Sequence, residues 1–227
     1  MRISVIMPAH NAEPYIGEAL ASIAAQTYPA HEVLVFNDAS TDETDRAIER
    51  SGVPVKLLHG EVRNAARARN LAAAEATGDW LAFLDADDVW YPTHLADAHA
   101  LLEPSHAVAM KAHFDKWIGN EVIEWSVPWP TTEPRADLHH DQFVEWRRLK
   151  RYFNNCGVVM RRDRFKAVGG YDETQLRRHD FVLFMEVIHG HRWAFNPKSE
   201  MKIRMDTPGS ISRSIVSCAY YRVRGLR

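Results

Sequence analysis

Three carboxylates stand close together in the sequence, at Asp85, Asp87 and Asp88. They follow the apolar run Trp80–Leu84, which predicts a strand buried on both faces. Carboxylates crowded after such a strand repel one another, and a divalent cation would relieve the repulsion because hard cations such as Mg²⁺ prefer oxygen ligands. The alternative is a solvated turn whose aspartates cap the next helix. Spacing alone does not separate a metal-diphosphate site from this turn.

Two more polar loops follow predicted strands. The strand Ile3–Met7 leads into Pro8–Asn11, and the strand Glu32–Phe36 leads into a loop that contains Asp38. In an open α/β sheet, ligands bind at the carboxyl ends of the strands, so both loops are expected at the same edge as the three aspartates. An aspartate there could accept a hydrogen bond from the N3–H of uracil. Residues 40–43 (STDE) also fit a helix N-cap, and both interpretations can hold at once.

The first 90 residues alternate between predicted strands and predicted helices. The expected strands are Ile3–Met7, Glu32–Phe36, Val55–His59 and Trp80–Leu84. Helical spacing of apolar residues predicts helices near residues 14–26, 43–51 and 65–76. Repeated β-α units of this length predict a parallel sheet with right-handed crossovers.

The pattern is looser after residue 90. A helix is expected near residues 92–102, antiparallel strands near Val108–Phe114 and Glu121–Trp125, a helix near 141–152 and a strand at Gly157–Arg161. Residues 126–140 contain three prolines and no apolar periodicity, which predicts a loop that could cover a site. The two halves are expected to share one core, as a single domain over residues 1–227.

Composition limits the possible classes. The chain has 227 residues, a net charge of −2 and 46% hydrophobic residues, which fits a globular domain and gives no global field for nucleic acid. Cys156 and Cys218 are too few for a disulfide framework or a thiolate zinc site, so a reducing, cytoplasmic compartment is expected.

The end of the chain is basic. It carries Arg213, Arg222, Arg224 and Arg227 without an acid among them, and nearby apolar residues fall at helical spacing. A basic amphipathic helix can lie on an anionic membrane surface, which would place the protein at the inner face of the membrane. The alternative is an ordinary terminal helix packed on the domain. No apolar run approaches the roughly 20 residues that a membrane span needs.

Several motifs occur in a fixed order. They are SVIMPAHN (4–11), ALASIAAQTY (19–28), VFNDASTDET (35–44), ARARN (66–70), GDWLAFLDADD (78–88), VGGYDE (168–173) and HD (179–180). Each motif alone is weak, but the whole set in this order resembles family-2 glycosyltransferases of the GT-A fold. The resemblance covers residues 3 to about 212. It implies an α/β fold with a nucleotide-sugar-binding half (1–90) and an acceptor and catalytic-base half (91–227).

The resemblance implies a nucleotide-sugar donor, usually a UDP-sugar. Asp38 would contact the base, Pro8 and Ala9 would line it through their backbone, and Asn11 belongs to the same loop. Asp85 would lie near the ribose. The metal, Mn²⁺ or Mg²⁺, would be bound by Asp87 with support from Asp88, and would neutralise charge on the leaving group. Arg69 could reach a phosphate, although such arginines more often lie solvated or paired on a helix face.

Asp180 matches the catalytic base of the family. Inverting transfer needs one carboxylate to take the proton of the acceptor hydroxyl while its oxygen attacks the anomeric carbon. The apolar residues after Asp180 predict that it heads a helix; the alternative role is an N-cap. The chain departs from the family at His179, where an acid is usual, and at Asp206, near the place of a late histidine.

The expected activity is therefore metal-dependent, inverting transfer of a sugar to a hydroxyl of a saccharide or lipid-linked acceptor, in cell-surface polysaccharide or glycolipid synthesis. Two other classes compete. A sugar nucleotidyltransferase needs a glycine-rich, basic phosphate loop after the first strand, and Pro8–Asn11 supplies none. A nucleotide-sugar-binding module that lost catalysis is disfavoured by the intact Asp85, Asp87, Asp88 and Asp180.

Overall fold

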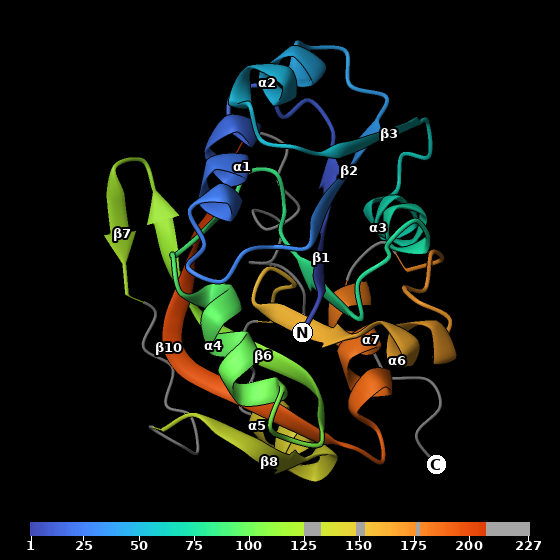
Figure 1. The fold of residues 1–227 in the computed structure, drawn as a ribbon, viewed down its shortest axis with the longest axis vertical. Helices are drawn as coiled ribbons and strands as arrows, with labels where there is room; N and C mark the ends of the chain where they lie inside the picture. The colour runs from blue at the N-terminus through green and yellow to red at the C-terminus, as the bar shows by residue number, and fades with distance from the viewer. Residues whose placement is uncertain (125–132, 149–152, 176–177, 208–227) are drawn as a thin grey trace.

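The computed structural model describes residues 1–124, 133–148, 153–175 and 178–207. Apolar runs form one sheet, and amphipathic segments form helices on its two faces (Figure 1). The strands are β1 (Ile3–Ala9), β2 (Glu32–Asp38), β3 (Lys56–Gly60), β4 (Trp80–Phe83), β5 (Val89–Trp90), β6 (Ala107–Ile118), β7 (Glu121–Ile123), β8 (Arg135–His139), β9 (Val158–Arg161) and β10 (Arg192–Arg204). The helices are α1 (Ile16–Ala24), α2 (Thr44–Ser51), α3 (Ala65–Ala74), α4 (His94–Leu102), α5 (His140–Arg148), α6 (Arg162–Ala167) and α7 (His179–Ile188).

The sheet is mixed but mostly parallel. Its order is β3-β2-β1-β4-β9-β6-β10-β5, with β7 paired to β6 and β8 paired to β10. Strands β3, β2, β1 and β4 are parallel neighbours. Strand β9 is antiparallel to both β4 and β6, and β10 is parallel to β6, so β6 and β10 point the same way as the N-terminal strands. The expected α/β fold with a mainly parallel sheet and a smaller antiparallel portion is confirmed.

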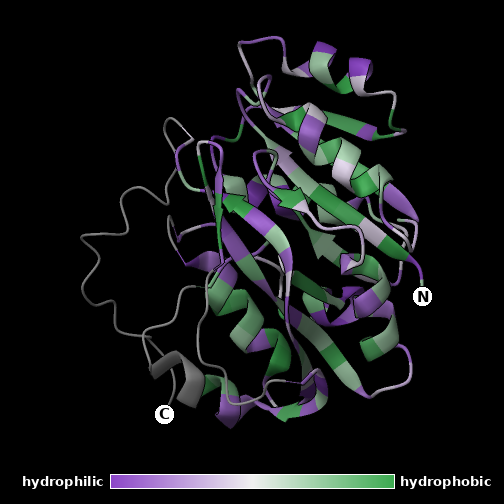
Figure 2. Cartoon of the chain, turned by 90° about the vertical axis from the view of Figure 1, so that its left-hand side faces the viewer, coloured by the Kyte–Doolittle hydropathy of each residue, from purple (hydrophilic) through white to green (hydrophobic). Residues whose placement is uncertain are grey.

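Both faces of the sheet are buried, because successive side chains on a strand point to opposite faces. Along β1, Val5 and Met7 join the cluster that includes α1, α2 and α4, whereas Ile6 joins the cluster that includes α3, α6 and α7. Figure 2 shows the apolar residues along the strands and the inner sides of the helices. Continuous apolar runs on β1 and β4 are the expected signature of a sheet covered on both faces.

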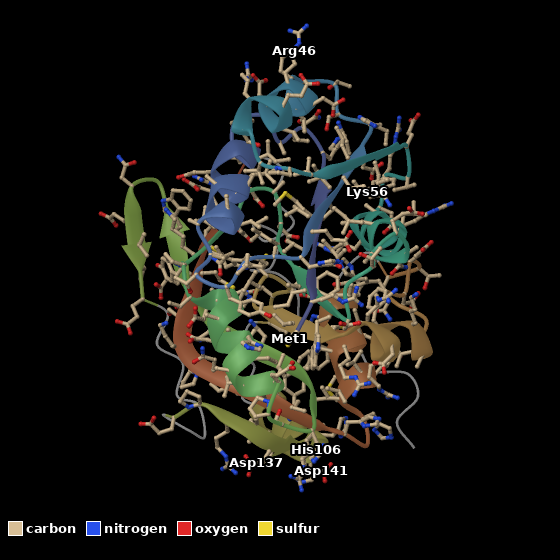
Figure 3. All side chains as sticks on the ribbon, in the orientation of Figure 1. Met1, Arg46, Lys56, His106, Asp137 and Asp141 are labelled. Carbon is tan, nitrogen blue, oxygen red and sulfur yellow. The ribbon has the colours of Figure 1, made fainter. Side chains whose placement is uncertain are left out.

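Most charged side chains of the described residues lie outside this core, although Arg69, Asp88, Lys111 and Glu200 are buried. Figure 3 labels Arg46, Asp137 and Asp141, which project from the outer surface of the molecule. Among the described residues, no helix has both the length and the apolar character that a membrane crossing requires. The basic segment at residues 213–227, for which membrane contact and packing on the domain were the alternatives, lies outside the described residues.

Two strands differ from the sequence-based prediction in a way that matters for the site. Strand β1 continues to Ala9 and β2 continues to Asp38, each two residues beyond the predicted end. Pro8 pairs with Phe36 and Ala9 with Asn37 in the ladder between these strands. Pro8, Ala9 and Asp38 therefore lie on neighbouring strand ends rather than in loops, which fixes their backbones.

The prediction of a loop over residues 126–140 was wrong for Arg135–His139, which forms β8. This strand pairs antiparallel with β10, and only Leu138 of its side chains is fully buried. A short, mostly polar strand gives little periodic signal, and its partner lies more than 50 positions away in the sequence. Residues 125–132 of the same predicted loop lie outside the described residues.

Strand β10 was not predicted at all. It has 13 residues, pairs with β6, β8 and β5, and contains several register shifts against β6. Its alternation is broken at these irregularities, so its sequence lacks a clean period of two. The strand ends at Arg204, beside the turn that carries the three aspartates.

Candidate functional site

The three aspartates after β4 form a tight turn at the carboxyl end of the sheet. The backbone N–H of Asp88 donates to the carbonyl of Asp85 over 3.1 Å. Asp88 is buried, and its carboxylate accepts the N–H of Arg204 at 2.9 Å and the thiol of Cys156 at 3.0 Å. Asp88 thus ties the turn to β10 and to the segment before β9. Asp87 is only partly buried and remains nearer to solvent.

The carboxylates of the aspartate turn repel one another more than the surrounding protein stabilises their charge. Burial and the neighbouring Asp85 raise the pKa of Asp87 above its ordinary value. Burial, Asp87 and Asp85 together raise the pKa of Asp88 well above its ordinary value. Such repulsion is what a bound cation removes, because a nearby positive charge favours the ionised carboxylates.

The donor set favours a hard cation bound through oxygen. One ligand atom each from Asp85, Asp88 and Cys156 lie within 4.8 Å of one another. Burial raises the pKa of the Cys156 thiol well above its ordinary value, so this sulfur stays protonated and is a poor ligand. The carboxylate oxygens are the ligands that Mg²⁺ and Mn²⁺ prefer. The turn fits the predicted metal through its aspartates, not through Cys156.

Asp38 lies at the end of β2, where its carboxylate organises the next loop. One oxygen accepts the N–H groups of Val62 and Arg63 at 2.6 and 2.9 Å, and the other accepts that of Asn64 at 3.1 Å. Three backbone donors around one carboxylate hold the connection from β3 to α3 in a fixed shape. Asp38 therefore shapes this edge of the sheet, and its contact with a nucleotide base stays a prediction.

Asn11 joins the loop after β1 to the loop after β2. Its backbone N–H donates to Ser40 Oγ at 2.9 Å, and its side-chain carbonyl accepts the N–H of Thr41 at 2.8 Å. Within the predicted capping segment 40–43, Ser40 and Thr41 bind Asn11 and do not cap α2. The side chain of Asp42 accepts the N–H of Thr44 at the start of α2.

Arg69 connects the aspartate turn to the other half of the chain. It is buried on α3, and its guanidinium forms an ion pair with Asp85. A second guanidinium nitrogen lies 3.1 Å from Nε2 of His179, and the group stacks over Tyr171 at 5.7 Å from the ring centre. Burial lowers the pKa of Arg69, but Asp85 outweighs this and raises it overall, so the charge persists.

Asp180 lies in the first turn of α7, next to His179. Its carboxylate accepts the N–H of Phe181 at 2.8 Å. Burial raises the pKa of Asp180 to about 6, against the smaller opposing effects of the Phe181 N–H and of Arg69. The prediction that Asp180 heads a helix is confirmed within one residue, and Arg69 links its segment to the aspartate turn.

The late segment contributes Arg204 rather than Asp206. Asp206 accepts the N–H of Gly119 at 2.8 Å, in the turn between β6 and β7. Arg204 donates from its side chain to the carbonyl of Asp87 and to Glu18 on α1, and its guanidinium lies 3.6 Å from the ring centre of Trp117. The sequence pointed to this segment but not to this arginine.

Comparison with known families decides the classification. The sequence profile described as Glycosyl transferase family 2 matches residues 4–169. The chain belongs to glycosyl transferase family 2. The match contains the ends of β1, β2 and β4 and the segment before β9, so the family assignment rests on the part of the chain that carries the acidic turn and Asp38.

Individual members of glycosyl transferase family 2 agree with this. The chain is 35% identical over 123 residues to the UDP-Glc:α-D-GlcNAc-diphosphoundecaprenol β-1,3-glucosyltransferase WfgD of Escherichia coli, covering 53% of this chain and 49% of that protein. It is 36% identical over 113 residues to the poly(ribitol-phosphate) β-N-acetylglucosaminyltransferase TarS of Staphylococcus aureus, covering 47% of this chain and 20% of that protein. The chain thus spans about half or less of the length of these relatives.

Solved structures show the same fold. The crystal structure of S. aureus TarS 1–349 in complex with UDP-GlcNAc has a TM-score of 0.77 and 25% sequence identity, and covers 97% of this chain and 62% of that chain. The complex of the same fragment with UDP has a TM-score of 0.75 over 90% of this chain and 60% of that chain. The expected GT-A fold is confirmed by this likeness.

Proposed function

We propose that the chain is a metal-dependent, inverting glycosyltransferase that moves a sugar from a UDP-sugar to a hydroxyl of an acceptor. The observation that carries the proposal is the double contact of Arg69 with Asp85 and His179. It joins two acidic segments that lie far apart in the sequence, the turn after β4 and the start of α7. Inverting transfer needs such a pair, with the leaving group held at one and the proton removed at the other.

The donor half of the proposed site consists of neighbouring strand ends. Pro8 and Ala9 at the end of β1 would line the nucleotide base through their backbone, and Asp38 at the end of β2 would contact it. Asp85 would face the ribose. Asn11 would act indirectly, since its side chain is engaged with Thr41 and sets the shape of the two loops.

Asp87 would bind Mn²⁺ or Mg²⁺, with Asp88 holding the turn in place. The metal supplies charge neutralisation of the diphosphate when it is bound. Support comes from the raised pKa values of both aspartates, which have burial as their largest cause and Asp85 as a shared neighbour. Arg69, buried and paired, would keep Asp85 oriented rather than bind phosphate itself.

Asp180 is proposed as the base that accepts the proton of the acceptor hydroxyl. Its pKa of about 6 suits this task, because the carboxylate is ionised at neutral pH yet basic enough to take a proton in the transition state. The acceptor is proposed to be a saccharide, polymeric or lipid-linked. WfgD is named for a GlcNAc-diphosphoundecaprenol acceptor and TarS for a poly(ribitol-phosphate) acceptor, which supports this class.

The test is nucleotide release from a panel of UDP-sugars with Mn²⁺ or Mg²⁺, in the presence of simple saccharides and lipid-linked sugars. The proposal expects UDP release with at least one donor, loss of release with a chelator, and recovery when metal is added back. Tight UDP binding without release from any donor would favour a binding module. Release of a nucleoside monophosphate or pyrophosphate would favour other chemistry.

A further inference from the structure

His179 lies at the junction between the aspartate turn and the proposed base. Its Nε2 atom is 3.1 Å from Nη1 of Arg69, while another nitrogen of the same arginine pairs with Asp85. A guanidinium can only donate, so Nε2 must accept and the imidazole must be neutral with its proton on Nδ1. Burial and the adjacent Arg69 lower the pKa of His179 to about 4, which agrees with a neutral ring.

The ring is also fixed by packing. Its centre lies 5.5 Å from that of Tyr171 in an edge-on arrangement, and the hydroxyl of Tyr171 donates to Asn155 at 2.7 Å. Arg69 stacks over the same tyrosine. His179 and Arg69 therefore both pack against the buried Tyr171.

The charges around Asp180 come from several elements. Arg69 on α3 favours its ionised form, and Asp85 after β4 opposes it. Lys111 on β6 and Tyr171 before α7 also interact electrostatically with Asp180. His179, the neighbour on the same helix, adds no charge while it is neutral. Arg69 pairs with Asp85, and its positive charge also acts on Asp180, whose pKa it lowers.

We propose that His179 is a positioning residue for the transfer step: as a neutral acceptor it holds Arg69 in place without cancelling the positive charge that keeps Asp180 ionised. This inference rests on the proposed function, since it assumes that Asp180 is the base. An acid at position 179 would also hold Arg69. Such an acid would, however, give Arg69 a second carboxylate partner in addition to Asp85. It would also place a negative charge directly beside Asp180.

Two nearly isosteric substitutions separate charge from shape. His179→Gln keeps a neutral acceptor, whereas His179→Glu adds one negative charge at the same place. The readout is the pH dependence of kcat for UDP release at saturating donor and metal. The acid limb is the fall of kcat at low pH, which reports the pKa of Asp180. We expect the acid limb of His179→Glu to move to higher pH by about one unit, because a like charge raises a carboxyl pKa. The acid limb of His179→Gln should match the wild type.

Folding and the base assignment are checked separately. UDP affinity close to the wild-type value shows that a variant is folded at the donor end. If His179→Glu does not fold, the pH dependence of Arg69→Gln is measured instead. Loss of the positive charge at Arg69 should also move the acid limb to higher pH. An unmoved limb in a folded His179→Glu, or an equal movement in His179→Gln, would overturn the inference.

The proposed function and this inference fail differently. Full turnover by Asp180→Asn would reject Asp180 as the base, and the proposed mechanism with it. Loss of turnover in Asp180→Asn together with an unmoved acid limb in His179→Glu would leave the base in place and reject only the role of His179.

Discussion

Glu32, at the amino end of the N-terminal parallel strands, is held in the opposite way to Asp87 and Asp88, which follow the carboxyl end of β4. At the amino end, Glu32 accepts hydrogen bonds from Ser4 Oγ, from the N–H and hydroxyl of Thr77, and from the N–H of Gly78. Burial alone would raise its pKa, but these bonds outweigh burial and lower it to about 2. At the carboxyl end, Asp87 and Asp88 have raised pKa values because burial and mutual repulsion are not offset.

Asp180 resembles Asp87 and Asp88 in having a raised pKa. It accepts one backbone N–H, and burial raises its pKa to about 6. Donors that surround a carboxylate stabilise its charge and suit a structural role. A buried carboxylate with few donors is costly to the fold, and such groups gather where a ligand or a proton completes the site. The comparison thus separates Glu32, a structural acid, from Asp87, Asp88 and Asp180. Asp38, at the end of β2, accepts three backbone N–H groups and is held in the same way as Glu32.

The largest expected effect on ligand binding concerns the carboxyl end. Asp87→Ala should weaken metal-dependent UDP binding by at least about 100-fold, because loss of a metal ligand should cost no less than loss of a group that supports a ligand, which costs about 10- to 100-fold. Calorimetry of UDP binding with and without Mn²⁺ measures it. Asp79→Ala is the control, because Asp79 is an exposed acid just before β4 that pairs with Arg2. Equal affinity and metal response in wild type and Asp87→Ala would contradict the metal assignment.

The second effect is on pH dependence. Asp180 works as a carboxylate, and its pKa is raised to about 6, so kcat should be level above pH 7 and fall about tenfold per unit below pH 6. The measurement is kcat for UDP release between about pH 4.5 and 8. An acid limb at or below pH 4 would show that the pKa of Asp180 is not raised. It would contradict the distinction drawn between Asp180 and hydrogen-bonded acids such as Glu32.

The third effect is on stability at the amino end. The folded pKa of Glu32 is about 2, below its unfolded value, so its contribution is full above about pH 4.5 and is lost as the pH falls toward 2. Glu32→Gln should lower the free energy of unfolding by about 2 kcal/mol at pH 7 and by less at pH 3. Denaturant unfolding at both pH values measures it.

The matched control for Glu32→Gln is Glu49→Gln, on the exposed face of α2, which should change stability by less than about 0.5 kcal/mol. A Glu32→Gln protein as stable as the control at pH 7 would show that the donors around Glu32 do not stabilise its charge.

The smallest effect concerns the junction of the two halves. Asn64 caps α3 by accepting the N–H groups of Ala66 and Arg67, and its amide donates to the carbonyl of Glu173. Asn64→Ala should cost about 1 kcal/mol of unfolding free energy, the usual value for a lost cap. Asn64→Asp restores the cap but not the donor to Glu173. Recovery of most of the stability in Asn64→Asp would assign the loss to the cap, and no recovery would assign it to the junction.

Much of the N-terminal half was predictable because its signals are local. Runs such as Trp80–Leu84 have a length and composition that identify a buried strand, and a polar cluster directly after such a strand marks the carboxyl edge. The turn at Asp85, Asp87 and Asp88 was therefore located from sequence. Its exact support, by Arg204 from β10 and by Cys156, depends on contacts across long sequence separations that no local period encodes.

The role of Arg69 was only partly predictable. Arg67 and Arg69 looked alike in the sequence, but Arg67 is exposed and Arg69 is buried against Asp85. One signal was present: Arg69 lies three residues after Ala66 and four before Ala73, both buried on the face of α3 that packs on the sheet. The contact with His179 carried no such signal, because it joins α3 to α7.

The central claim is that Asp180 removes the proton while the aspartate turn holds the nucleotide. Its most direct test measures two quantities on one variant, Asp180→Asn: kcat for UDP release and the dissociation constant for UDP with metal. Asp163→Asn, an exposed acid on α6, serves as the control. We predict that kcat falls at least about 1,000-fold while UDP affinity stays within about twofold. Retained turnover, or equal loss of turnover and UDP affinity, would contradict the claim.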